Sequence, residues 1–122
     1  MSGKKAFIID DERINTIILR RLLKQYKLEI DSSANPRDAV EKATYENYDI
    51  IFVNHQMEDM GGEEVVKKLI STGNKVPPVV ALTSISDDLD EQSVYSYHIM
   101  CPVDFKHLNK IIKKVFEGGE VK

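Results

Sequence analysis

The hydrophobic positions of this chain fall into short apolar runs separated by segments with helical spacing. The runs AFII (6–9), DIIFV (49–53) and PVVAL (78–82) are nearly continuous, which is typical of parallel strands covered on both faces. Two shorter runs, LEI (28–30) and HIM (98–100), indicate two further strands. Strands that alternate with helices in this way predict an α/β fold with one doubly wound, five-stranded parallel sheet.

The first two helices are indicated by apolar spacing and by a capping signal. The first should carry one apolar stripe made of Ile14, Ile18, Leu19, Leu22, Leu23 and Tyr26. The second is expected over 34–43. There Asn35 can cap the amino end, and Pro36 can occupy the first helical position, where its missing N–H costs nothing.

Two more helices follow the third and fifth predicted strands. One is defined by Val65, Val66, Leu69 and Ile70, and Gly73 can end it. In the last helix Asp104 is the expected N-cap and Gly118–Gly119 the expected end. Its predicted buried stripe is Phe105, Leu108, Ile111, Ile112 and Val115.

One segment departs from the alternation. Residues 84–100, SISDDLDEQSVYSYHIM, are acidic in the first half and keep no helical apolar face. The fourth helix of the series is therefore expected to be short or irregular. We predict one domain over 1–117, and residues 118–122 are either a C-terminal tail or the stub of a linker.

Composition narrows the class of protein. A chain of 122 residues with net charge −3 suits a single soluble domain. Lysines and arginines alternate with acids along the sequence, so neither a nucleic-acid partner nor a membrane partner is expected. The single cysteine, Cys101, excludes an internal disulfide. We expect a cytoplasmic protein that is a monomer or a weak dimer.

The residues that follow the predicted strands suggest a site. In doubly wound sheets functional groups gather beyond the carboxyl ends of the strands. Here these positions hold Asp10, Asp11, Asn54, Thr83 and Cys101. Two adjacent carboxylates repel each other, and Mg²⁺ is a natural cation for them because it needs few protein ligands. The alternative is that these acids only serve the first turn of the following helix.

Four stretches of the chain resemble the receiver domain of two-component response regulators. They are FIIDDE, DIIFVNHQMEDMGG, PVVALTS and CPVDFKHLNKII, and the likeness covers essentially the whole chain. The resemblance implies a flavodoxin-like fold and a role in two-component (phosphorelay) signal transduction. In that family an acidic pair and an aspartate at the end of the third strand hold Mg²⁺. A histidine kinase donates a phosphoryl group to that aspartate. A side-chain hydroxyl and a lysine then contact the phosphoryl group.

Several positions match this pattern. Asp10 and Asp11 match the acidic pair, and Gln56 matches the residue whose backbone carbonyl completes the metal shell. Thr83 matches the hydroxyl residue, and Pro102 matches the cis-proline that follows the lysine. The resemblance therefore implies a Mg²⁺ site at Asp10, Asp11 and Gln56.

Other positions depart from the pattern. Asn54 stands at the phospho-acceptor position, Cys101 at the lysine position, and Glu58 at the position of the usual proline. The interval from Thr83 to Cys101 is shorter than usual by about one helical turn. His98, next to Tyr97, falls at the position of the family's aromatic switch residue.

The two central departures remove the chemistry of phosphorylation. An amide oxygen has no formal charge and is a poor nucleophile, although it can be a weak metal ligand and its NH₂ can donate to a carboxylate. A thiol near two carboxylates should keep its proton and carries no positive charge. Losing an aspartate and a lysine together leaves the charge of the site unchanged at −2, which favours a natural loss over an engineered Asp→Asn change.

We therefore expect a pseudo-receiver that is not an enzyme and that works by protein–protein interaction. Its partner would be a histidine kinase, an output domain or another regulator, and weak Mg²⁺ is the one cofactor considered. The resemblance places the interaction surface on the face that includes Tyr97 and His98. Two alternatives stay open: an ordinary phospho-accepting receiver captured as an Asn54 variant, and a small Mg²⁺-dependent hydrolase.

Overall fold

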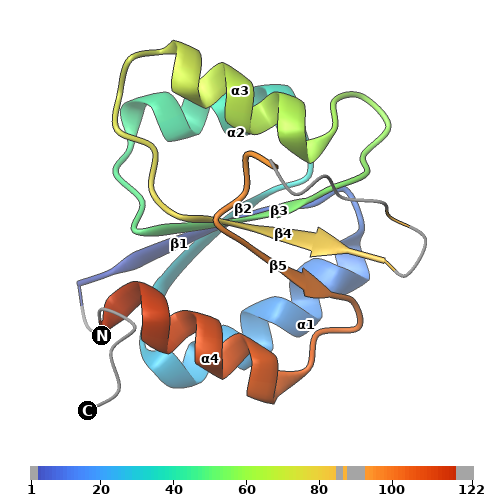
Figure 1. Ribbon diagram of the computed structural model, residues 1–122, viewed down its shortest axis with the longest axis vertical. Coiled ribbons are helices and arrows are strands. Elements are labelled where there is room, and N and C mark those ends of the chain that lie inside the picture. The colour runs from blue at the N-terminus through green and yellow to red at the C-terminus, as the bar shows by residue number, and fades with distance from the viewer. Residues whose placement is uncertain (1–2, 85–86, 88–92, 118–122) are drawn as a thin grey trace.

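A single five-stranded parallel sheet has helices on both faces (Figure 1). The computed structural model describes residues 3–84, 87 and 93–117. The strands are β1 (Lys5–Ile9), β2 (Glu29–Ser33), β3 (Ile50–Asn54), β4 (Val79–Thr83) and β5 (Tyr97–Met100), in the spatial order β2-β1-β3-β4-β5. The helices are α1 (Arg13–Leu23), η1 (Lys24–Tyr26), α2 (Pro36–Tyr45), α3 (Gly62–Ser71) and α4 (Phe105–Phe116). The predicted doubly wound, flavodoxin-like α/β fold is confirmed.

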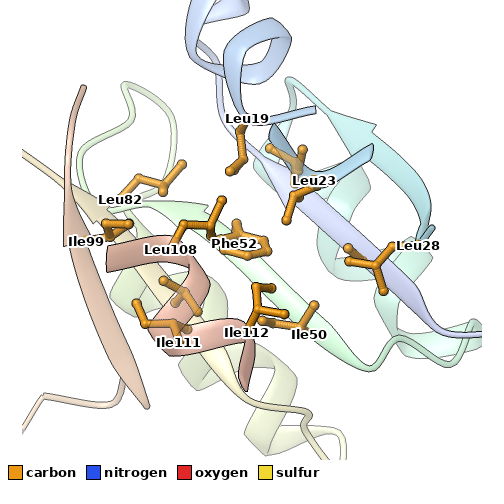
Figure 2. Close-up of a cluster of buried hydrophobic side chains, with 13 residues drawn as sticks. Leu19, Leu23, Leu28, Ile50, Phe52, Leu82, Ile99, Leu108, Ile111 and Ile112 are labelled. Carbon is orange, nitrogen blue, oxygen red and sulfur yellow. The ribbon is translucent and has the colours of Figure 1, made fainter. Parts of the chain in front are cut away.

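Each face of the sheet has its own apolar core. On the face covered by α1 and α4, Phe52 is surrounded by side chains from both helices, among them Leu19, Leu23, Leu108 and Ile112 (Figure 2). On the face covered by α2 and α3, Phe7 stacks on Tyr48 with ring centroids 4.5 Å apart. Because β1, β3 and β4 are buried from both sides, their sequences are continuous apolar runs rather than alternating ones.

The predicted stripe of α1 is only partly buried. Leu19 and Leu23 are fully buried, whereas Ile14 is 68% exposed and Ile18 is 41% exposed. At 3.6 residues per turn Leu19 lies roughly 140° around the helix from Ile14, so the six apolar positions span two faces. The face with Leu19 and Leu23 packs on the sheet. Tyr26 falls in the short 3₁₀ helix η1 rather than in α1.

The other helix boundaries follow the predicted signals closely. The Asn35 side chain accepts hydrogen bonds from the N–H groups of Arg37 and Asp38, so it caps α2 as expected. Gly73 follows α3 with φ of +81°, a conformation that favours glycine. The Asp104 carboxylate accepts a hydrogen bond from the N–H of Lys106 at the start of α4.

Two predicted apolar positions are more exposed than their spacing suggested. Ile70 is 54% exposed, because α3 buries Val65, Val66 and Leu69 instead. Phe105, expected in the buried stripe of α4, is 38% exposed. Its ring stacks on Tyr26 with centroids 6.3 Å apart. The helical spacing of the apolar residues does not show that these two side chains, near the ends of their helices, lie at the edge of the core.

Parts of the segment between β4 and β5 lie outside the described residues. These are residues 85–86 and 88–92, so the prediction of a short or irregular fourth helix is not tested. Residues 118–122, the predicted tail with Gly118 and Gly119, also lie outside them. Within the described part of the chain, no helix is long and apolar enough to cross a membrane.

Candidate functional site

The carboxyl ends of four strands surround one open cleft. Its volume is about 860 Å³, and residues that line it include Asp11, Asn54, Thr83 and Cys101. The strand order reverses between β1 and β3, since β2 lies on one side of β1 and β3 on the other. Such a switch point is where doubly wound sheets bind ligands. The structure thus brings together the strand-end residues that the sequence singled out.

Asp10 is the buried acid of this site. Its side chain is 2% exposed, and Oδ1 accepts hydrogen bonds from the N–H of Glu12 at 2.8 Å and from Nδ2 of Asn54 at 2.9 Å. Oδ2 is buried and has no hydrogen-bond partner within the described chain. Burial raises the pKa of Asp10, and the charge of Asp11 raises it slightly further. The interactions with the Glu12 N–H and with the side chains of Asn54 and Asn15 lower it in part.

Both the nitrogen and the oxygen of the Asn54 side-chain amide form hydrogen bonds. Nδ2 donates to Asp10, and Oδ1 accepts a hydrogen bond from the N–H of Gln56 at 3.2 Å. A carboxylate at this position could accept from Gln56 but would face the carboxylate of Asp10 without a proton between them. The surroundings therefore suit a side chain with one donor and one acceptor, which is an amide.

Asp11 and Gln56 lie at the rim of the cleft and are exposed. Asp11 Oδ2 accepts a hydrogen bond from the N–H of Glu58 at 3.3 Å. Neither Asp10 nor Asp11 falls in the first turn of α1, which begins at Arg13 and contains no acid there. The alternative that these acids serve the helix start is therefore not supported by their positions.

The acidic pair offers a limited ligand set for a cation. Within the described residues no group of three or more His, Cys, Asp or Glu side chains is placed to hold a metal ion. The buried, unpartnered Oδ2 of Asp10 is an atom that a cation would satisfy, and Asp11 lies beside it. Two carboxylates with waters fit the preferences of Mg²⁺, although Asn54 turns its NH₂, not its oxygen, toward Asp10.

Thr83 and Cys101 close the other side of the cleft. Thr83 is 6% exposed, and its hydroxyl donates to the carbonyl of Ile99 at 3.4 Å. Burial raises the pKa of the Cys101 thiol, and the nearby charge of Asp10 raises it further, as predicted. The peptide bond between Cys101 and Pro102 is cis. No lysine or arginine is among the described residues that line the cleft.

A contact that sequence reasoning missed joins His55 to Tyr95. Nδ1 of His55 lies 2.8 Å from the hydroxyl of Tyr95. A Cβ added at Gly62 would come within 2.6 Å of that hydroxyl and 2.8 Å of the Asn54 carbonyl oxygen. The loop after β3 is therefore packed against the residues that precede β5. Forty residues separate the two partners, so no local pattern could have revealed the pair.

The predicted interaction residues lie on β5. Tyr97 is half-buried and packs against the core under α4, whereas His98 is exposed. They do not line the cleft at the strand ends. The predicted surface and the candidate site are therefore separate parts of the molecule.

Comparison with known proteins identifies the family. The sequence profile of the response regulator receiver domain matches residues 6–114. This chain belongs to that family. The receiver is 29% identical over 126 residues to hybrid signal transduction histidine kinase L of Dictyostelium discoideum, covering 94% of this chain and 7% of that protein. It thus corresponds to a small part of that relative.

Two solved structures show the same fold. A CheY-like receiver domain from Methylobacillus flagellatus has a TM-score of 0.85 at 22% identity, with 93% of this receiver and 99% of that chain covered. The receiver domain of Ssk1 from Saccharomyces cerevisiae, solved with the histidine phosphotransfer protein Ypd1, has a TM-score of 0.81 at 22% identity, with 93% and 88% covered. The predicted receiver fold is confirmed, and the protein is a response regulator receiver domain of two-component signalling.

Proposed function

We propose that this receiver is a pseudo-receiver: it signals without aspartyl phosphorylation, by binding other proteins. The observation that carries the proposal is the hydrogen bond from Asn54 Nδ2 to Asp10 Oδ1. The group at the expected acceptor position is neutral, and its nitrogen is held against a carboxylate. An attack on a phosphoryl group needs an anionic oxygen at that place.

The surroundings of Asn54 also lack the charge that phosphoryl transfer uses. The developing charge on a transferring phosphoryl group needs cationic groups around it. Cys101 holds a proton at neutral pH because burial and Asp10 raise its pKa, and Asp87 and Glu58 add negative charge to the cleft. Thr83 donates its hydroxyl to the backbone instead of presenting it to a ligand.

In this proposal Mg²⁺ is a weakly bound ion that the function does not require. Asp10 and Asp11, with the backbone carbonyl of Gln56, would hold it weakly, and it would neutralise the acidic pair. The acids themselves keep the cleft negative and hold the loop after β3 through Glu58. No step of the proposed function depends on the ion.

Binding is then the remaining way to signal. The receiver domain of Ssk1, which has the same fold, was solved in complex with the histidine phosphotransfer protein Ypd1. By analogy, a histidine kinase, an output domain or another regulator is the class of partner that we propose. Tyr97 and His98 on β5 are the proposed contact residues. Residues 1–117 form the proposed binding unit, which acts by differential affinity for a partner rather than by catalysis.

Intact mass spectrometry after incubation with Mg²⁺ and acetyl phosphate tests the proposal. We expect no phosphoryl adduct on the native chain and a measurable adduct on the double variant Asn54→Asp, Cys101→Lys. The single variant Asn54→Asp should gain less, because it lacks a lysine side chain at position 101 to contact the phosphoryl group. A phosphoryl adduct on the native chain would show that the amide does not end the chemistry, and tryptic mapping would then locate the acceptor.

A further inference from the structure

The exposed side of α4 carries a concentration of positive charge. Its lysines follow helical spacing and are all exposed: Lys106, Lys110, Lys113 and Lys114. Over 104–117 they are opposed only by Asp104 and Glu117, which gives this segment a net charge of +2, whereas the whole chain carries −3. The ion pairs within the described residues involve Lys5, Arg37 and Lys42, and no lysine of α4. Among the described residues, no acid therefore pairs with the lysines of this helix.

A groove runs between this helix and β5. It has a volume of about 390 Å³, and its lining includes Tyr97 and His98 from β5 and His107, Lys110 and Lys114 from α4. Ile111, which is 3% exposed, lies at its base. No described acid lines it. The groove therefore combines an apolar base with a basic rim.

The same groove borders a free edge of the sheet. Within the described residues, β5 pairs with β4 on one side and with no strand on the other (Figure 1). An edge strand offers unpaired backbone groups to an incoming extended segment. In an added strand alternate side chains would face α4, because successive side chains of a strand point to opposite faces. Acidic side chains at those positions would meet the lysines.

We propose that this groove binds an extended acidic segment of a partner protein, which pairs with the edge of β5 and places its acids against Lys110 and Lys114. This inference rests on the proposed function and names the chemistry of its partner. A polyanion such as nucleic acid is disfavoured because the chain as a whole is acidic and such binding needs many phosphate contacts. The apolar base at Tyr97 and Ile111 instead suits a protein side chain.

Fluorescence anisotropy of the full chain with labelled peptides tests this inference. The probe is a peptide of about eight residues, the length of a strand, in which Glu alternates with Val, and the reference probe has Lys in place of Glu. The native chain should bind the acidic probe and not the basic one. The double variant Lys110→Glu, Lys114→Glu should bind it at least about tenfold more weakly, because like charges would then face each other.

A matched variant separates local charge from net charge. Lys67 and Lys68 on α3 are also exposed lysines, and their double replacement by Glu changes the net charge by the same amount. This control should bind the acidic probe as the native chain does. Circular dichroism of both variants confirms that each is folded.

Several outcomes would overturn the inference. They are equal binding of the acidic and basic probes, equal weakening by the α4 and α3 variants, and tighter binding of a short DNA duplex than of the peptide. Self-association of the native chain that the α4 variant abolishes would make a second copy the occupant instead. None of these results requires a phosphoryl group, so failure here is distinct from failure of the proposed function, which the mass measurement decides.

Discussion

Replacing Asn54 with aspartate should destabilise the receiver in the absence of divalent cations. The new carboxylate would lie where Nδ2 now donates to Asp10 at 2.9 Å. The change removes a hydrogen bond to a charged group, worth about 1.5 to 3 kcal/mol, and adds a repulsion between like charges. Asp10 is almost fully buried and cannot be screened by solvent.

The magnitude follows from the distance. Two full charges at this separation, with an effective dielectric constant near 20, would repel by about 6 kcal/mol. Protonation of one member of the pair and rotation of the half-buried side chain at 54 relieve most of this. We therefore expect a loss of about 2 to 4 kcal/mol in the free energy of unfolding at pH 7.

Urea unfolding with and without Mg²⁺ measures this effect. The loss in Asn54→Asp should shrink as the pH falls toward 4, because a shared proton then removes the repulsion, and it should shrink on adding Mg²⁺. The matched control Asn54→Ala loses the hydrogen bond without adding charge, so its loss should depend little on Mg²⁺. Adding Cys101→Lys to Asn54→Asp should restore part of the stability, since it returns the site to its original charge.

Two results would contradict this account of Asn54. If Asn54→Asp in EDTA at pH 7 is as stable as the native chain, the contact with Asp10 is not what favours an amide at this position. If Asn54→Ala and Asn54→Asp lose the same amount at every pH and Mg²⁺ concentration, the repulsion plays no part.

Three further predictions concern neighbouring residues. The pKa of Asp10 is raised in the folded state, so its contribution to stability falls as the pH rises. Asp10→Asn should therefore be more stable relative to the native chain at pH 7 than at pH 3, and an equal difference at the two pH values in urea unfolding would contradict this. Gly62→Ala should lower the free energy of unfolding by about 1 to 3 kcal/mol in urea, because its Cβ would meet Tyr95 and a backbone carbonyl. The matched change Gly61→Ala should cost less, because that Cβ would meet only the His55 carbonyl oxygen, at 3.2 Å. Iodoacetamide at pH 7.5 should alkylate Cys101 more slowly than a free cysteine, because both burial and the charge of Asp10 raise the pKa of its thiol. The rate should increase in Asp10→Asn. A rate in the native chain equal to that of a free cysteine would contradict this prediction.

Much of the fold was predictable because its signals are local. The three strands buried on both faces gave continuous apolar runs, and caps such as Asn35 satisfy backbone donors two and three residues away. Which face of α1 is buried was not predictable. Ile14 and Leu19 are equally apolar, and only the position of the helix over the sheet decides that one is exposed and the other buried.

The candidate site, too, was predictable from the sequence only in part. The sequence alone determined which residues follow the strands, and therefore that Asp10 and Asn54 lie at the carboxyl edge of the sheet with no lysine at 101. The observed strand order makes β1 and β3 neighbours and so brings Asp10 and Asn54 together at the switch point. Only the tertiary structure decided that the amide of Asn54 points its nitrogen at Asp10 and that His55 meets Tyr95. These contacts depend on the stagger of strands far apart in the chain, and no local pattern specifies that stagger.

The basic surface is the clearest case of what sequence reading overlooked. Along the chain, Lys106 to Lys114 alternate with apolar and polar residues and give no basic run. Helical winding places Lys110 and Lys114 on one side, and packing sets that side beside His98 of β5. The sequence determined the charges and their helical spacing. The tertiary structure decided that they face a groove, because only the packing of α4 on the sheet fixes which side of the helix remains exposed.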